Sequence, residues 1–167
     1  SLIVGTAPGT DIKLAEEKIK GYKNFANKIW NISRFILENT ENFDCENKPE
    51  ITEEDQELLS ELDTLVTEAT NEIEGLKFYL AGEKIYHYVW HRFADIILEE
   101  SKKIFKDGSE NEQTSRRWTL LHILVVCLKL LHPFMPYVTE ELWNIMPVKN
   151  KKLLMVENWP SSQLRDK

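Results

Sequence analysis

The chain has 167 residues, the length of one domain with a substantial core. Its composition, 42% hydrophobic and 29% charged with six Gly and six Pro, predicts a soluble, helix-rich globular protein. The net charge of −7 argues against a generic nucleic-acid binder, whose domain is usually basic. However, residues 13–34 carry a net +4 and residues 38–74 a net −13. One end of the domain is therefore expected to attract a polyanion while the other repels it.

Two features bear on the cellular setting. Cys45 and Cys127 show no CxxC spacing, which is typical of a reduced, cytoplasmic protein. No run of 18 or more uncharged apolar residues occurs, so we expect no membrane partner and no membrane-spanning segment. The chain opens without a Met and without a signal-peptide pattern, and we expect a fragment or processed product of a longer protein.

Turn signals divide the chain into helices. Residues 1–10, rich in Gly, Thr and Pro, are expected to be a linker, residues 11–147 a helical domain, and residues 148–167 a C-terminal extension or linker with one short extended segment. Asp11 is the expected N-cap of the first helix. The predicted helices cover residues 12–40, 52–80, 83–106, 111–132 and 139–146.

Local signals set the predicted helix boundaries. Thr52 begins the second helix, with Asp55 as a capping-box-like carboxylate three positions on, and Ala81–Gly82 marks a break. Pro133 and Pro136 end the fourth helix. That helix is apolar nearly all round, so it belongs at the centre of a bundle or against another domain. Long helices with short loops predict an all-α fold, an antiparallel bundle of about five helices.

The first helix carries the most informative pattern. At 100° per residue, one side is an ordinary core face that includes Phe25, Ile29, Ile32 and Ile36. The opposite side gathers amides, cations and aromatic side chains, which can hydrogen-bond base edges, neutralise phosphates and stack on unpaired bases. Its members are Lys20, Lys23, Asn24, Asn27, Lys28, Trp30, Asn31, Arg34 and Phe35. Alternatively, the three Asn bond to neighbouring helices or to a linked domain.

A row of potential metal ligands follows the third helix. His87, His91, Asp95 and Glu99 recur every four residues, and two His at that spacing can hold Zn²⁺. The backbone of Asp95 lies about 12 Å along the helix from that of His87, and neither HExxH nor a cysteine ligand is present. We therefore expect no metal and a polar face that packs or ion-pairs with Lys102.

Other candidate residues have structural interpretations. Tyr86, Trp90 and Phe93 have the spacing of core residues. Arg116 and Arg117 are expected on the solvated surface of the fourth helix, with phosphate or partner contact as the alternative. No Ser/His/Asp or Cys/His triad and no P-loop occurs, so we predict no catalytic residues in this chain.

Three segments are similar to one family in order and spacing. GTDIKL…GYKNFANKIWNISRF, IYHYVWHRFADIILEESK and LLHPFMPYVTEELW resemble the anticodon-binding helical domain of valyl-tRNA synthetases, and isoleucyl and leucyl enzymes share a looser version. The resemblance covers residues 5–160. Ala94, Ile96 and Ile97 depart from it, since many valyl enzymes look more like Cys, Trp and Tyr there.

The resemblance implies the excised tRNA-binding domain of a large ligase. In the family, a separate catalytic domain uses ATP and Mg²⁺, and its His-Ile-Gly-His and Lys-Met-Ser-Lys-Ser signatures are absent here. We therefore expect the fragment alone to be inactive, monomeric, cytoplasmic and without cofactor. Its expected partners are the anticodon loop of a tRNA and the catalytic domain of the same chain. The alternatives are the same domain of an isoleucyl enzyme, or a helical protein-interaction module without RNA.

The expected RNA contacts follow from the first helix. Its Lys23–Arg34 face would meet the anticodon loop, and Phe43 in the following loop would offer a stacking surface. Lys20, Lys23, Lys28 and Arg34 would pair with phosphates. Four such contacts predict a log–log salt slope of roughly −3, at about −0.7 per phosphate for single strands.

Overall fold

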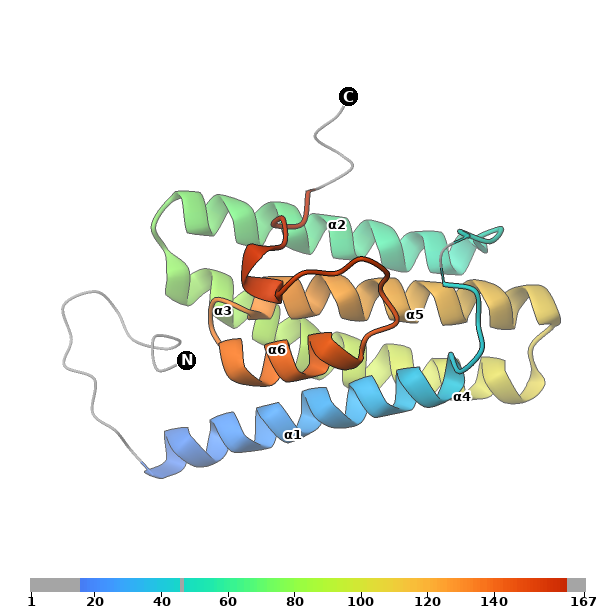
Figure 1. Ribbon diagram of the computed structural model, residues 1–167, viewed down its shortest axis with the longest axis horizontal. Coiled ribbons are helices and arrows are strands. Elements are labelled where there is room, and N and C mark those ends of the chain that lie inside the picture. The colour runs from blue at the N-terminus through green and yellow to red at the C-terminus, as the bar shows by residue number, and fades with distance from the viewer. Residues whose placement is uncertain (1–15, 46, 162–167) are drawn as a thin grey trace.

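The computed structural model describes residues 16–45 and 47–161, and within them every regular element is a helix (Figure 1). The elements in chain order are α1 (Glu16–Asn39), α2 (Glu53–Glu74), α3 (Phe78–His87), the π-helix η1 (Tyr88–Ile97), α4 (Leu98–Asp107), α5 (Glu110–Leu131), α6 (Pro136–Ile145) and the 3₁₀ turn η2 (Leu154–Val156). Since α3, η1 and α4 follow one another directly, they form one rod. The predicted all-α bundle of about five helices is confirmed.

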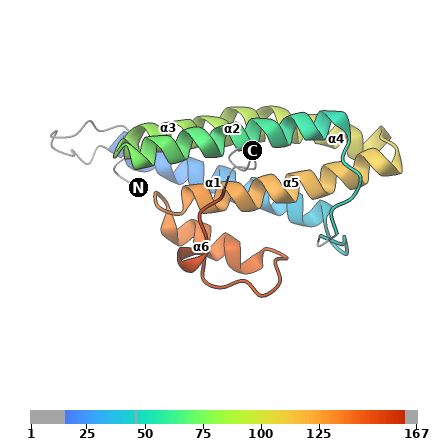
Figure 2. The same ribbon diagram turned by 90° about the horizontal axis from the view of Figure 1, so that it is seen from above.

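Helix α5 lies at the centre of this bundle. It packs against α1, α2, α3, α4 and α6, and its apolar side chains between Leu120 and Leu131 are largely buried. Helices α1 and α2 lie on opposite sides of it (Figures 1 and 2). The all-round apolar pattern of this helix is thus explained by burial within the bundle itself.

The break after α2 lies earlier than predicted. Leu76 adopts a left-handed conformation with φ of 58°, and the N–H of Lys77 donates to the carbonyl of Glu72 at 2.7 Å, which ends the helix. Ala81 and Gly82, the predicted break, are instead buried within α3. These two small residues therefore lie in the interior of a helix, and the chain turns before them, at Leu76.

The prediction that three aromatics of the third rod are core residues holds for one of them. Phe93 is fully buried, but Trp90 is half-buried and Tyr86 is exposed. Both rings lie against Phe25 of α1, with centroids 4.5 Å apart for Tyr86 and 6.0 Å for Trp90. They cover the edge of the core instead of filling it. Trp90 lies within η1, where the π-helix changes the angle per residue, so the α-helical pattern does not extend through this element.

The two arginines of α5 face inward, which corrects the expectation of a solvated pair. The Arg116 side chain is buried and donates from Nε to the carboxylate of Asp55, which also accepts from the Ser115 hydroxyl at 2.6 Å. Arg117 donates from Nε to the carbonyl of Asn39, the last residue of α1, at 3.0 Å. A cation at a helix C-terminus is favourable, so α5 caps α1.

The same ion pair corrects the predicted capping box. Thr52 does accept a hydrogen bond from the N–H of Asp55, but the Asp55 carboxylate is committed to α5. A complete capping box occurs at the start of α5, between Ser109 and Glu112. Its bonds to Ser109 hold the pKa of the Glu112 carboxyl below its usual range.

The C-terminal part of the bundle differs from expectation in two places. Helix α6 begins at Pro136, the residue expected to end α5, because proline suits the first position of a helix. The expected extended segment is the 3₁₀ turn η2, and Leu154 in that turn is buried. Trp159 donates to the Thr70 hydroxyl at 2.9 Å, so the chain after α6 packs back onto α2.

The expected linker over residues 1–10 and the expected N-cap Asp11 lie outside the described residues. In the described part, no helix has the length and apolar character needed to cross a membrane.

Replacing Asp55 with Ala should lower the free energy of unfolding by about 3–5 kcal/mol, because Arg116 would remain buried without its counter-charge. Urea denaturation followed by far-UV circular dichroism measures the change. Glu54→Ala, in the same turn of α2 but exposed, is the matched control and should cost about 1 kcal/mol or less. Equal losses in the two variants would show that the buried pair does not stabilise the fold.

Candidate nucleic-acid interface

Helix α1 forms one outer edge of the bundle and buries a single face (Figure 1). Phe25, Ile29, Ile32 and Ile36 are at most 3% exposed and contact the core, as the sequence predicts. Because an edge helix has only one buried side, the opposite side of α1 must face solvent.

Seven of the ten predicted site residues lie on that solvent side and are exposed. These residues, called the α1 strip, are Lys20, Lys23, Asn24, Asn27, Trp30, Asn31 and Arg34. The strip extends about 21 Å, at 1.5 Å per residue. Among the described residues, no hydrogen bond joins the strip's Asn side chains to another helix. Structural bonding of these amides within the described chain therefore does not explain them.

Arg34, at the C-terminal end of the strip, makes only a weak ion pair within the chain. Arg34 Nε lies 3.7 Å from Glu38 Oε1, and both side chains are about two-thirds exposed. Such an exposed pair contributes between 0 and about 1 kcal/mol. The guanidinium of Arg34 can therefore exchange this carboxylate for another anion at little cost.

Lys28 is placed differently from the strip. Its ammonium donates to the Asp95 carboxylate of η1 at 2.6 Å and lies 5.1 Å from the centroid of the Trp90 ring. The hydrogen bond and charge of Lys28, with a smaller contribution from His91, hold the pKa of the Asp95 carboxyl below its usual range. Lys28 thus ties α1 to η1 in addition to any contact that it makes with a ligand.

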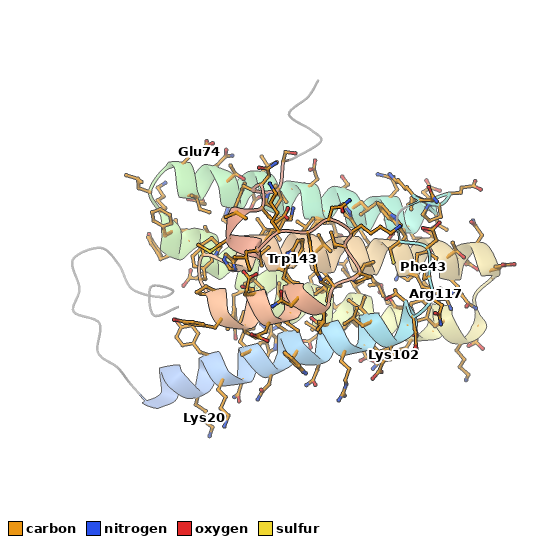
Figure 3. The ribbon with its side chains drawn as sticks, viewed as in Figure 1. Lys20, Phe43, Glu74, Lys102, Arg117 and Trp143 are labelled. Atoms are coloured by element: carbon orange, nitrogen blue, oxygen red, sulfur yellow. The ribbon has the colours of Figure 1, made fainter. Side chains whose placement is uncertain are left out.

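Two of the three aromatic residues predicted for the site, Phe35 and Phe43, are half-buried, whereas Trp30 is exposed. Phe35 packs against Phe105 of α4 with ring centroids 6.2 Å apart, and the Lys102 ammonium lies 5.9 Å from the centroid of its ring. Phe43 lies beyond the C-terminal end of α1, at the opposite end of the helix from Lys20 (Figure 3). The predicted site residues therefore form an elongated surface, not one compact pocket.

A hollow of about 280 Å³ opens where the strip meets the third rod. It adjoins Asn31 and Phe35 on α1 and Glu99 and Lys102 on α4, and the last two bond to each other at 2.6 Å. The predicted ion pair of this polar row with Lys102 is thus confirmed. The sequence pattern does not predict that Glu99 and Lys102 lie beside the first helix, because only tertiary packing brings α4 there.

The remainder of the polar row is also exposed. The rings of His87 and His91 lie 4.7 Å apart, and His91 Nδ1 lies 3.6 Å from the Asp95 carboxylate. Among the described residues, no group of three or more His, Cys, Asp or Glu side chains could hold a metal ion.

Comparison with known proteins identifies the kind of domain that presents this surface. The sequence model of one family, described as the anticodon-binding domain of tRNA ligase, matches residues 55–167, about two-thirds of the chain. The chain belongs to this family. The match begins in α2, so the family assignment is independent of the α1 strip.

Individual relatives extend the similarity over α1. The valine–tRNA ligase of Geobacter sulfurreducens is 36% identical over 97% of this chain, that of Aquifex aeolicus is 36% identical over 96%, and that of Laribacter hongkongensis is 37% identical over 96%. The matched part is 19%, 15% and 18% of these proteins, so the chain spans less than a fifth of their length. The resemblance to valyl-tRNA synthetases is confirmed.

A solved structure supports the fold. The chain in the ternary complex of Agrobacterium radiobacter K84 agnB2 LeuRS-tRNA-LeuAMS matches with a TM-score of 0.63 at 20% identity, over 98% of this chain and 19% of that one. The bundle of this chain thus shares its helical fold with the matched part of that structure.

Replacing Lys28 with Met should raise the pKa of the Asp95 carboxyl toward the ordinary Asp value, because the hydrogen bond and the charge that favour the ionised form are both lost. An NMR titration of the side-chain carboxyl carbon measures the pKa in both proteins. Lys23→Met, which removes a cation from the exposed strip, should leave that pKa nearly unchanged. An unshifted Asp95 in Lys28→Met would contradict the Lys28–Asp95 contact.

Proposed function

We propose that this chain is the tRNA-binding domain of a valyl-tRNA synthetase, and that in the whole enzyme it holds tRNA(Val) for ATP-dependent aminoacylation. The observation that carries the proposal is the match of nearly the whole chain, α1 included, to valine–tRNA ligases. The exposed amides and cations of the α1 strip support an RNA partner over a protein-interaction module.

In this proposal the α1 strip contacts the anticodon loop. Lys20, Lys23 and Arg34 pair with phosphates, and the exposed indole of Trp30 stacks on an unpaired base. The strip's Asn amides each offer a donor and an acceptor to base edges. Lys28 lies beside the strip and is bonded to Asp95, and its positive charge adds to the attraction of the RNA.

Charge separation supports a preferred orientation of the tRNA. Residues 13–34, which include most of α1, carry a net +4, whereas residues 38–74, which include α2, carry a net −13. The two helices lie on opposite sides of α5 (Figures 1 and 2). A polyanion is therefore attracted to the α1 side and repelled from the α2 side, despite the acidic net charge.

We further propose that the rest of the whole enzyme supplies the chemistry. ATP and Mg²⁺ bind in its catalytic domain, which precedes this bundle, and the bundle alone aminoacylates nothing. Exposed apolar side chains beside α6 and η2 support a contact with that domain, since Tyr137, Leu153, Met155 and Val156 are each 57–89% exposed. The protein acts in the cytoplasm, where tRNA is charged, and the isolated bundle is monomeric.

Binding of tRNA(Val) at varied salt tests the RNA surface. Replacing Lys23 or Arg34 with Ala should weaken binding and reduce the magnitude of the log–log salt slope by about 0.7 each, because one phosphate contact is lost. Lys77→Ala, at the turn before α3, removes the same charge away from the strip and should leave the slope unchanged. Fluorescence anisotropy measures both quantities.

The specificity assignment has its own test. Substituting the anticodon of tRNA(Val) should weaken binding to the parent chain, and the full-length enzyme should charge valine tRNA and not isoleucine tRNA. If tRNA binding is indifferent to the anticodon, and Lys23→Ala and Arg34→Ala bind as the parent does, then α1 is not the contact surface.

A further inference from the structure

A groove of about 590 Å³ lies between α2 and α5, separate from the hollow beside the α1 strip. Residues within 56–66 of α2 and within 118–129 of α5 line it, and we call it the α2–α5 groove. Leu62 and Val66 are buried apolar side chains of its wall, and Val125 and Val126 add half-buried ones. At 1.5 Å per residue, the α5 part of the groove extends about 17 Å. Helix α5 therefore has one stripe that the bundle covers only in part.

An aromatic pair and a cation lie at one end of this groove. The rings of Trp118 and His122 are stacked, with centroids 5.0 Å apart and an interplanar angle of 9°. The Lys48 ammonium, from the loop before α2, lies 5.3 Å from the centroid of the Trp118 ring. Lys48 is exposed, and among the described residues no carboxylate forms an ion pair with it. Its charge is therefore available to an anion from outside the chain.

Positive charge acts on the interior of the groove. Lys129, at the other end of the α5 part, lies 3.7 Å from the Glu157 carboxylate. Burial, and then the charges of Lys48 and Lys129, hold the pKa of the His122 imidazole below its usual range. Asp63 of α2 also lines the groove and repels anions. Lys48, which lacks a carboxylate partner, is consequently the favoured position for an acidic group.

The size and charge of the groove limit its occupant. Its volume lies within the range of about 300–1,000 Å³ for small-molecule pockets. An α-helix about 10 Å across and about 17 Å long would need roughly 1,300 Å³, about twice the space. A nucleic acid is disfavoured because residues 38–74 carry a net −13, and repulsion grows with the number of charges on the ligand. A small molecule with one negative charge satisfies both limits.

We propose that the α2–α5 groove binds a small, flat aromatic molecule with one acidic group. Its ring system lies against Trp118 and His122, where aromatic rings pack favourably. Its acidic group accepts a charge-assisted hydrogen bond from Lys48. No residue of the α1 strip lines this groove, so the site does not depend on the proposed tRNA contact.

The dye 8-anilinonaphthalene-1-sulfonate, an aromatic anion that fluoresces in apolar sites, is the probe for this groove. Lys48→Met should weaken its binding to the 167-residue chain about tenfold, because the charge-assisted hydrogen bond is lost. Lys106→Met removes the same charge from an exposed residue of α4 outside the groove, and should bind the dye as the parent does. N-phenyl-1-naphthylamine has the same rings without the sulfonate, and should bind equally to the parent and both variants.

Thiol protection locates the bound dye. Ser60 of α2 lines the groove, whereas Thr64, one turn further along, is exposed and does not line it. Saturating dye should slow the reaction of Ser60→Cys with iodoacetamide about tenfold and leave that of Thr64→Cys unchanged. Peptide mass spectrometry follows each site. In the full-length enzyme, Ser60→Cys should again react without dye and be protected by it.

Three results would overturn the proposal. Equal binding of the dye to Lys48→Met and Lys106→Met would show that Lys48 holds no acidic group. Unprotected Ser60→Cys would show that the dye binds elsewhere, such as the exposed apolar side chains beside α6. Unreactive Ser60→Cys in the full-length enzyme without dye would show that another domain covers the groove. The salt dependence of tRNA binding is measured separately, so each of these results leaves the proposed function standing.

Discussion

Burial of α5 is the constraint on which the rest of the structure depends. An apolar helix needs partners around its whole circumference, and the other rods of the bundle provide them. Each surrounding helix consequently has one inner and one outer side. The Arg116–Asp55 and Arg117–Asn39 contacts then hold α2 and the end of α1 to α5 at defined positions. The outward direction of the α1 strip follows from this packing.

The fold also reconciles an acidic chain with a polyanionic partner. The net charge of the chain governs attraction at long range, whereas a bound ligand interacts mainly with the charges close to it. The basic α1 and the acidic α2 lie on opposite sides of the bundle. At physiological salt the Debye length is about 8 Å, so charges on the far side of α5 are largely screened from the strip. The acidic α2 can therefore repel misplaced RNA without cancelling attraction at α1.

The interface combines two kinds of cation. Arg34 on the strip is exposed and weakly paired, so it can neutralise phosphates. Lys28 and Lys102 bond to the carboxylates of Asp95 and Glu99 at 2.6 Å, and they lie over the aromatic rings of Trp90 and Phe35. Pairing with carboxylates lowers their value as phosphate contacts. It also places acceptor oxygens beside the α1 strip, and acceptor oxygens suit base edges better than phosphates in the RNA contact that we propose.

The sequence by itself determined the all-α class, the central helix and the core face of α1, because each depends on hydrophobic spacing along one segment. It also indicated the family, through runs such as NFANKIWN and HPFMPYVTEELW. Local rules failed where tertiary packing decides a residue's role. Asp55 bonds to Arg116 instead of its own helix, and Gly82 is buried within α3 instead of ending a helix.

Only the tertiary structure brought Glu99 and Lys102 beside Phe35, because residues more than 60 positions apart become neighbours through packing. No periodicity encodes such a contact. Spacing along one helix predicts which side of that helix faces solvent. The hollow beside that side depends on where a second helix packs, which the spacing does not predict.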